Sequence, residues 1–398
     1  MVLDDSLEAG TPIKDILGPL FNAIDVEVTP DKAFALSHRG ISREVATIVG
    51  TKLKTPLSTT ELNSKTKDVI SVDLDKKGGC TRYIAGIMRG VKVGPSPDWL
   101  SDYLKSVGQK SINNLVDISN FMLLEIGHPT HIFDLNKLNK PAIEVSWAKK
   151  GEKFKALDEE TYELSKDHMV ITDTKNTIAL AGIIGGMESS VTDSTTEILI
   201  ESAYFDPVAI RKGSKKLNLL SEASRRFERG TDPNAASEAF NMIVQLMQEV
   251  AGGTLKSVIT DECSMDLGNT SIDLSSDKLL KYAGQDISSK EVETILKGLH
   301  IDTKKTKTGW SCSIPTFRTD LKVETDLIDE VFRCYGYDNI KSSFNYSSIM
   351  QFANDEESTI ISLKHHLSSL GFHQSYNNSL EELEEAVSYT HLRAHETP

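Results

Sequence analysis

The sequence predicts a multidomain α+β protein, in which a mixed α/β module is followed by a small winged-helix-like α+β domain. Three observations support this fold class. The 398 residues suffice for roughly two to three domains. Strand-like segments gather between residues 140 and 210, with helical segments on both sides. Short helices and strands precede a longer helix between residues 267 and 343. The composition, 39% hydrophobic and 26% charged, excludes collagen, low-complexity disorder and small disulfide scaffolds.

The first 75 residues form a mixed segment. Residues 23–32 predict a strand that runs into a proline turn. Residues 37–50 predict a helix that ends at Gly50. Residues 51–70 are polar and rich in Thr, Ser and Lys, which is typical of a linker or a surface excursion.

Two helices and a series of strands are predicted next. Ser96 and Pro97 form an expected N-cap followed by proline at the first helical position, and this helix ends at Gly108. The apolar segment 115–126 ends at Gly127. The strand-like segments after it are 143–148, 152–157, 168–173, 177–182 and 197–205.

The best-marked helix begins at Asp232-Pro233 and is terminated by Gly252-Gly253. A third unit of the chain follows it. Within this unit Ser289 and Glu293 lie near capping-box positions. Its predicted elements are a strand at 271–274, helices at 275–284 and 288–299, a short strand at 310–315, and a final helix at 322–335 that ends at Gly336.

The charge balance argues against a protein that coats nucleic acid through bulk electrostatics. There are 44 Lys and Arg against 58 Asp and Glu, a formal net charge of -14. The four cysteines are scattered, which is typical of reduced thiols in a cytosol. We find neither a secretory signal nor an apolar stretch near the ~20 residues of a membrane span. We therefore expect a cytoplasmic protein without membrane contact.

A cluster of carboxylates is the first candidate site. Asp326, Asp329 and Glu330 share one helical face, and Asp320 could fold back toward it. We expect Val323, Leu327, Val331 and Tyr335 to be buried on the opposite face. Oxygen ligands suit a hard cation such as Mg²⁺. The alternative is a solvated acidic face, with Asp329 paired to Arg333.

Two further candidates are a histidine and a glycine-rich segment. His131 follows an X-Pro turn, where it could position a water or bond a backbone carbonyl. The alternative is a purely structural histidine. Gly182, Gly185 and Gly186 allow close approach of the backbone to a ligand, and a glycine-rich β-turn is the default interpretation.

The last two candidates are a glutamate and an arginine cluster. Glu201 follows an apolar strand, and a half-buried carboxylate there could accept a bond from a ligand hydroxyl, although it could also end the strand in solvent. Arg225, Arg226 and Arg229 suit phosphate recognition. The alternative is internal pairing with the neighbouring acidic residues.

Taken together, four segments resemble the family of bacterial phenylalanine–tRNA ligase β subunits. They are SINNLVDISNFMLLEIGHPTHIFD, ALAGIIGGMESSVTDSTTEILIESAYF, SEASRRFERGTDP and IPTFRTDLKVETDLIDEVFRCYGYDNI. The segment VTPDKAFALSHRGISREVA fits the same family, with Asp31-Lys32 where it commonly has Asn-Arg. The resemblance covers residues 1–380. It implies a remnant of an N-terminal domain at 1–75, a B3/B4-type editing domain at 76–266, a B5-type domain at 267–343 and the start of a class II synthetase-like core at 344–386.

The resemblance also implies an editing site that hydrolyses tyrosine wrongly attached to tRNA(Phe). Such a site is needed because a pocket for phenylalanine rejects an added hydroxyl only weakly. Glu201 matches the position that accepts the tyrosine hydroxyl, Gly185 the glycine beside the substrate ring, and His131 the histidine near the scissile ester. Ser221 and Ala223 match pocket-lining positions, although Ser221 replaces the usual Thr and lacks its methyl group.

The resemblance further implies a Mg²⁺ ion at Asp320, Asp326, Asp329 and Glu330, shared with an α subunit. ATP-dependent attachment of phenylalanine to tRNA(Phe) would take place on that α subunit, within an α2β2 tetramer. The chain resembles a fragment that lacks the N-terminal OB-fold module and the C-terminal catalytic-like and anticodon-binding domains. Residues 387–398 fit no family pattern and resemble a translated sequencing adapter. Two alternatives remain at this point, a stand-alone deacylase that edits in trans and a non-catalytic RNA-binding module.

Overall fold

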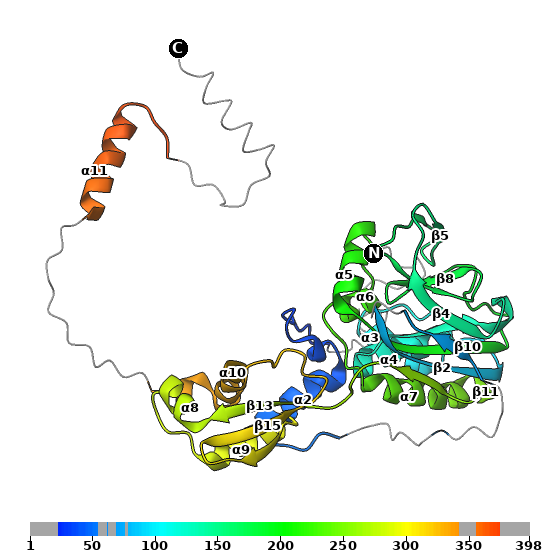
Figure 1. Ribbon diagram of the computed structural model, residues 1–398, viewed down its shortest axis with the longest axis horizontal. Helices are drawn as coiled ribbons and strands as arrows, with labels where there is room; N and C mark the ends of the chain where they lie inside the picture. Colours follow the sequence, from blue (N-terminus) through cyan, green and yellow to red (C-terminus); the bar gives the residue numbers. More distant parts are fainter. Residues whose placement is uncertain (1–22, 55–61, 63–68, 76–78, 342–355, 375–398) are drawn as a thin grey trace, which may run out of the picture. The chain divides into compact units, whose positions relative to one another are not determined.

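The computed structural model describes residues 23–54, 62, 69–75, 79–341 and 356–374 (Figure 1). The chain divides into two compact units, residues 1–342 and 343–398. In the second unit, helix α11 spans Glu356–Ser369. The predictions for residues 387–398 and for most of the 51–70 linker lie outside the described residues. No helix in the described ranges is long and apolar enough to cross a membrane.

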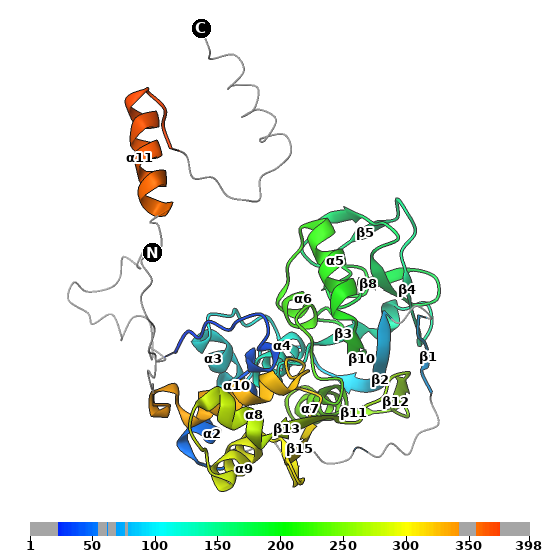
Figure 2. The same cartoon turned by 60° about the vertical axis from the view of Figure 1, so that its left-hand side comes forward.

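Two five-stranded sheets form the larger part of the first unit. One sheet has the order β11-β2-β10-β3, with β12 also paired to β2, and the other has the order β1-β4-β7-β8-β9. The long strands β2 and β10 are antiparallel neighbours, as Figure 2 shows. The strands are β1 (Ser71–Asp73), β2 (Cys80–Val91), β3 (Thr130–Asp134), β4 (Ala142–Trp147), β7 (Met169–Thr172), β8 (Thr177–Leu180), β9 (Ile184–Gly185), β10 (Glu197–Phe205), β11 (Gly252–Leu255) and β12 (Thr260–Cys263), with a separate hairpin of β5 (Lys153–Lys155) and β6 (Thr161–Glu163).

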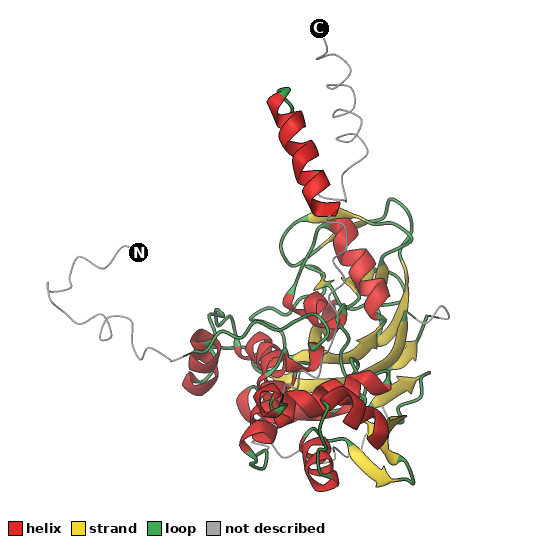
Figure 3. Ribbon diagram, turned by 90° about the vertical axis from the view of Figure 1, so that its left-hand side faces the viewer, coloured by secondary structure: helices red, strands yellow, loops and turns green. Residues whose placement is uncertain are grey.

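Helices cover one face of the β2–β10 sheet (Figure 3). The even-numbered residues Ile84, Ile198 and Ile200 face these helices. The odd-numbered Tyr83 and Leu199 pack on the other side, in a second core with the strands of the other sheet. This alternation follows from the two-residue period of a strand. The helices are α3 (Asp98–Ser106), α4 (Asn114–Ile126) and α7 (Ala235–Val250), while α5 (Pro207–Leu217) and α6 (Glu222–Phe227) follow β10.

A smaller α+β module follows. Its antiparallel sheet has the order β13-β15-β14 and packs on three helices around a separate apolar core. The fold class predicted from the sequence, a multidomain α+β protein in which a small α+β module follows a mixed α/β module, is therefore confirmed. The elements are β13 (Thr270–Ser275), α8 (Ser276–Ala283), α9 (Ser289–Gly298), β14 (Asp302–Lys305), β15 (Gly309–Ile314) and α10 (Glu324–Tyr335).

The segment before the first sheet contains helix α2 (His38–Val49). Ser37 caps its start by accepting the backbone N–H of Gly40. Gly50 ends it in the left-handed conformation, which confirms the predicted end of the helix. Helix α2 packs against the smaller module, where Thr47 Oγ1 donates to the carbonyl of Gly298 at 2.8 Å. Three short 3₁₀ turns are also present in the described residues, at Ala33–Ala35, Leu135–Lys137 and Tyr337–Asn339.

Several local predictions are wrong. Residues 23–29 form no strand, and no strand in the described part of the chain pairs with them. Ser96 does not cap helix α3, because its hydroxyl donates to Asp117 at 2.6 Å. Helix α3 therefore begins after Pro97.

One further helix start and one capping box differ from the prediction. Helix α7 begins after Asn234 rather than at Asp232, whose carboxylate accepts the Asn234 backbone N–H and forms a turn. The capping box of α9 uses Ser288 and Glu291. Glu293 instead accepts a bond from the indole of Trp310 at 2.9 Å.

Candidate functional site

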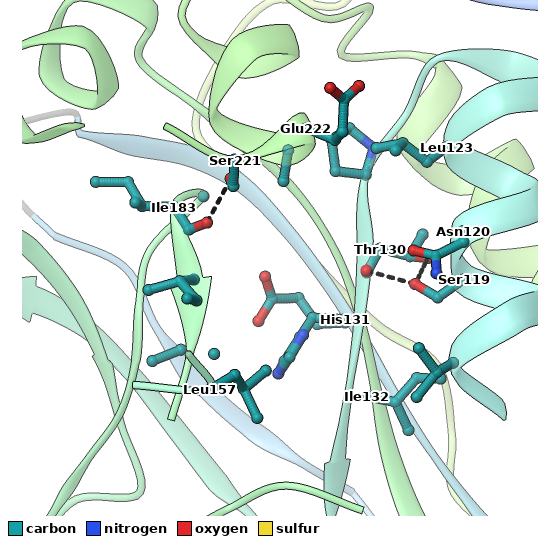
Figure 4. A pocket seen from close by; sticks show the side chains of 18 of the residues that line it. Ser119, Asn120, Leu123, Thr130, His131, Ile132, Leu157, Ile183, Ser221 and Glu222 are labelled. Atoms are coloured by element: carbon teal, nitrogen blue, oxygen red, sulfur yellow. Dashed lines mark hydrogen bonds between the residues drawn. The ribbon is translucent and has the colours of Figure 1, made fainter. Parts of the chain in front are cut away.

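A cavity of about 520 Å³ lies beside the odd-numbered face of the β2–β10 sheet. This volume is within the range of small-molecule pockets, about 300–1,000 Å³. The five residues predicted for an editing pocket all line it, and Figure 4 shows His131 and Ser221 among the lining side chains. They are His131, Gly185, Glu201, Ser221 and Ala223. The structure thus brings together residues that lie up to 92 positions apart in the sequence, from 131 to 223.

Glu201 is a buried carboxylate in the middle of β10, with 6% of its surface exposed. Its Oε2 accepts a hydrogen bond of 2.7 Å from the phenolic hydroxyl of Tyr83 on β2. Burial raises the pKa of Glu201 to about 7, although the bond from Tyr83 opposes this rise. The carboxylate is therefore a strong acceptor for a donor that reaches the cavity.

His131 lies directly opposite Glu201 on the neighbouring strand β3. Directly paired residues point to the same face of a sheet, with β-carbons about 5 Å apart. The imidazole packs edge-on against Phe133 with ring centroids 4.6 Å apart. Burial lowers the pKa of His131 to about 4, so the ring is neutral at pH 7 and offers one donor and one acceptor.

Gly185 allows the imidazole to lie against the backbone of β9. A β-carbon built on Gly185 would be 2.5 Å from Cε1 of His131 and 2.9 Å from Cδ1 of Leu157. Any side chain at this position would therefore displace the histidine or close the cavity. Gly182 has a positive φ of 65° in the turn before β9, where the predicted glycine-rich turn is found.

Ser221 and Ala223 lie at the start of helix α6. The Ser221 hydroxyl donates to the carbonyl of Ile183 at 2.6 Å and accepts the backbone N–H of Ser224 at 3.0 Å (Figure 4). It thereby caps the helix and fixes the turn before β9 against it. The Ser221 hydroxyl is thus hydrogen-bonded within the protein. Ala223 forms an apolar part of the cavity wall.

The arginine cluster after Ser221 is largely paired within the protein. Arg226 is 7% exposed, and its Nη1 bonds the carboxylate of Glu222 at 2.7 Å. The same guanidinium donates to the carbonyl of Leu36 at 3.2 Å. Arg229 donates to the carbonyl of Val28 at 3.4 Å. The alternative of internal pairing therefore fits this cluster better than phosphate recognition. Arg226 and Arg229 also bond backbone carbonyls of the N-terminal segment.

The four carboxylates predicted to bind Mg²⁺ do not converge. Asp320 and Glu330 lie together, but Asp326 accepts the backbone N–H groups of Lys322 and Val323 at the start of α10. Asp329 accepts the hydroxyl of Tyr337 at 2.7 Å. Within the described residues, no group of three or more His, Cys, Asp or Glu side chains is arranged to hold a metal ion.

Asp320 and Glu330 are neutralised by basic side chains. Arg318 bonds Asp320 at 2.7 Å and Glu330 at 3.1 Å, and Arg333 bonds the other oxygen of Glu330 at 2.6 Å. Lys32 also bonds both carboxylates. The hydrogen bond from Arg333, the charge of Arg318 and the bond from Lys32 outweigh burial and lower the pKa of Glu330 to about 2. These carboxylates as arranged here do not fit a Mg²⁺ site, because cations already occupy their oxygens.

The prediction of which α10 side chains are exposed and which are buried is partly wrong. Glu330 is 1% exposed, so it does not belong to a solvated acidic face. Val323 is 54% exposed and Tyr335 is half-buried, although both were expected in the core. Arg333 pairs with Glu330 and with Glu44 of α2, and not with Asp329.

Sequence reasoning missed Tyr83 and Arg318. Tyr83 lies in an apolar strand, and its partner Glu201 is more than 100 residues away, so no local pattern reveals the pair. Arg318 stands two residues before Asp320, and that spacing was a usable signal for an ion pair.

Comparisons with known proteins identify the relatives of this chain. Residues 79–252 match the B3/4 domain family, and residues 272–337 match the tRNA synthetase B5 domain family. A phenylalanine–tRNA ligase β subunit from Protochlamydia amoebophila is 39% identical over 343 residues, which cover 85% of this chain and 43% of that protein. The β subunit from Salinibacter ruber is 35% identical over 388 residues, which cover 96% of this chain and 47% of that protein.

The chain spans a little under half the length of these curated relatives. A crystal structure of an N-terminal fragment of the phenylalanyl-tRNA synthetase β subunit from Pyrococcus horikoshii is 18% identical to this chain, with a TM-score of 0.39. That alignment covers 77% of this chain and 85% of the fragment.

Proposed function

Since the chain belongs to the phenylalanine–tRNA ligase β-subunit family, we propose that its 520 Å³ cavity is an editing site that hydrolyses tyrosyl-tRNA(Phe). The observation that carries this proposal is a buried carboxylate, Glu201, whose Oε1 has no hydrogen-bond donor in the described part of the chain. A ligand hydroxyl supplies the donor that this oxygen lacks.

The selectivity of such a site follows from hydrogen-bond energetics. A tyrosyl group brings a hydroxyl to Oε1 of Glu201, whereas a phenylalanyl group leaves this oxygen without a donor and the carboxylate with Tyr83 as its partner. A hydrogen bond to a charged group contributes about 1.5–3 kcal/mol, which corresponds to roughly ten- to 150-fold in discrimination. An apolar pocket alone has no acceptor for the added hydroxyl, so it does not select the tyrosyl group.

His131 orients the attacking water in this proposal. Its lowered pKa makes it a weak base, so it acts through hydrogen bonds of its neutral ring rather than by holding a proton at pH 7. Because Gly185 has no side chain, the His131 ring and the substrate can contact each other beside it. Ser221 and Ala223 shape the wall at the start of α6.

The wider activity is proposed on the same family membership. The chain would act with an α subunit, in an α2β2 tetramer in the cytoplasm, to attach phenylalanine to tRNA(Phe) with ATP. Synthesis would take place on the α subunit and editing on this chain. The predicted Mg²⁺ ion enters no step of this proposal, because Asp320 and Glu330 are held by cations.

Hydrolysis of tyrosyl-tRNA(Phe) and phenylalanyl-tRNA(Phe) by the chain tests the proposal. We expect faster hydrolysis of the tyrosyl ester, and we expect Glu201→Gln to lower this preference by at least about tenfold. Glu197→Gln is the matched control, because Glu197 lies on the same strand but does not line the cavity. Equal hydrolysis of both esters by the unmodified chain, or an unchanged preference in Glu201→Gln, contradicts the proposal.

A further inference from the structure

Tyr83 lies beneath the candidate site without lining it. Its side chain is 0% exposed and belongs to the apolar core between the two larger sheets. It is not among the residues that line the cavity. Its one polar atom reaches Glu201 at 2.7 Å, so Tyr83 touches the site only through that carboxylate.

The register of the sheet explains this contact. Glu201 pairs with Ala85 on β2, and Ala203 pairs with Tyr83. Tyr83 and Glu201 are therefore diagonal neighbours on the same face, within reach of a long side chain. The small side chain of Ala85 leaves space beside Glu201, and His131 lies on its other flank.

The hydrogen bond leaves the two carboxylate oxygens unequal. Oε2 accepts the tyrosine hydroxyl, while no donor in the described residues bonds Oε1. The last torsion of a glutamate has a broad energy minimum, so an unheld carboxylate would rotate. Burial of the Tyr83 ring fixes the donor, and the donor in turn fixes the carboxylate plane.

We propose that Tyr83 is a positioning residue that holds Glu201 so that Oε1 receives the hydroxyl of the substrate. This inference rests on the proposed editing function and adds a residue that sets its specificity. Tyr83 forms no bond to the substrate itself. Its removal therefore slows hydrolysis of the tyrosyl ester more than hydrolysis of the phenylalanyl ester.

The same contact predicts a change in pH dependence. The titratable groups around Glu201 are Tyr83 and Cys80 from β2, His131 from β3 and Glu222 at the edge of the cavity. The bond from Tyr83 is the one interaction with Glu201 that lowers the pKa of this carboxyl. Loss of the bond raises that pKa above about 7, so the ionised acceptor forms only at higher pH.

The test compares Tyr83→Phe with the unmodified chain on both aminoacyl-tRNA esters across pH. We expect the preference for tyrosyl-tRNA(Phe) to fall about tenfold at pH 7, and the midpoint of its pH profile to move to higher pH. Tyr204→Phe is the control, because Tyr204 lies on the opposite face of β10. Circular dichroism and thermal unfolding establish that both variants are folded.

A double variant separates positioning from a general structural role. Because Tyr83 acts through Glu201, Tyr83→Phe should cause no further loss of preference in a Glu201→Gln background. A further loss there, or an unchanged preference and pH midpoint in the single variant, overturns the inference. If the unmodified chain has no preference, the proposed function itself fails. If Glu201→Gln loses the preference but Tyr83→Phe keeps it, only the role of Tyr83 fails.

Discussion

Glu201 and Glu330 are both buried glutamates, but they lie in opposite electrostatic surroundings. Glu201 is 6% exposed and has a tyrosine hydroxyl as its partner. Glu330 is 1% exposed and contacts Arg318, Arg333 and Lys32. The pKa is raised to about 7 in the first and lowered to about 2 in the second.

This contrast shows that burial alone does not identify a functional carboxylate. A buried carboxylate surrounded by cations already has its partners, and removing one of them destabilises the fold. A buried carboxylate without a cation keeps a free acceptor and a shifted pKa, and such groups gather at functional sites. The ion pairs of Asp320 and Glu330 therefore connect the smaller module to Lys32 of the N-terminal segment, whereas no cation in the described residues pairs with Glu201.

The largest expected effect is on stability, from removing a cation beside Glu330. Arg318→Met leaves two buried carboxylates with less compensation, and we expect the free energy of unfolding to fall by about 3–5 kcal/mol. Urea unfolding followed by circular dichroism measures this change. Lys105→Met removes an exposed ion pair with Asp102 as the control, with an expected change below about 1 kcal/mol. Equal changes in both variants would contradict the assigned role of the network.

A somewhat smaller effect is expected for Glu201 as a function of pH. Its pKa is about 7 in the folded protein and 4.5 ordinarily, so between these values the folded state binds more protons than the unfolded state. Stability therefore falls as pH rises through this window. Relative to Glu201→Gln, the unmodified chain should lose about 3 kcal/mol of unfolding free energy between pH 4.5 and 7.

Comparison with the Glu201→Gln variant is needed because other groups also change protonation in or near this pH range. The pKa of His131 is lowered from 6.5 to about 4, so its contribution makes stability rise with pH over that range. Glu330 contributes stability above pH 4.5 that is lost as pH falls toward 2. Both contributions cancel in the difference between the two proteins. A difference that stays constant from pH 4.5 to 7 would mean that Glu201 titrates normally.

The smallest expected effect is that of magnesium on this chain. Asp320, Glu330 and Glu44 carry three negative charges, which three cationic side chains already balance. Millimolar Mg²⁺ or its removal by a chelator should therefore leave the thermal unfolding midpoint unchanged. A stabilisation by Mg²⁺ that disappears in Asp320→Asn would restore the predicted metal site.

Much of the fold was predictable from the sequence because its signals are local. Ser37 and Gly50 mark both ends of α2, and strand β10 coincides with the apolar segment 197–205. The predicted helix start was wrong where a side chain forms a hydrogen bond to a residue far along the chain. Ser96 bonds Asp117 instead of capping α3, and the sequence contains no sign of that choice.

In the candidate site, too, some residues could be predicted from the sequence and others could not. Local sequence made Glu201 and His131 candidates and family resemblance suggested their roles, while the register of β10 with β3 places them side by side. Tyr83 escaped notice because its role depends on pairing between strands far apart in the chain. The helical spacing of Asp326 and Glu330 suggested a common acidic face, but two of the cations around Glu330, Lys32 and Arg318, come from other segments.

A measurement of the pKa of Glu201 distinguishes a carboxylate without a cation from an ordinary glutamate. Carboxyl ¹³C chemical shifts of the glutamate-labelled chain, followed by NMR across pH, report each titration, and Glu201→Gln assigns the resonance. We predict one glutamate resonance that titrates with a pKa of about 7 and disappears in the variant, while the Glu330 carboxylate stays ionised down to low pH. A Glu201 resonance that titrates near the ordinary value of 4.5 would contradict this prediction.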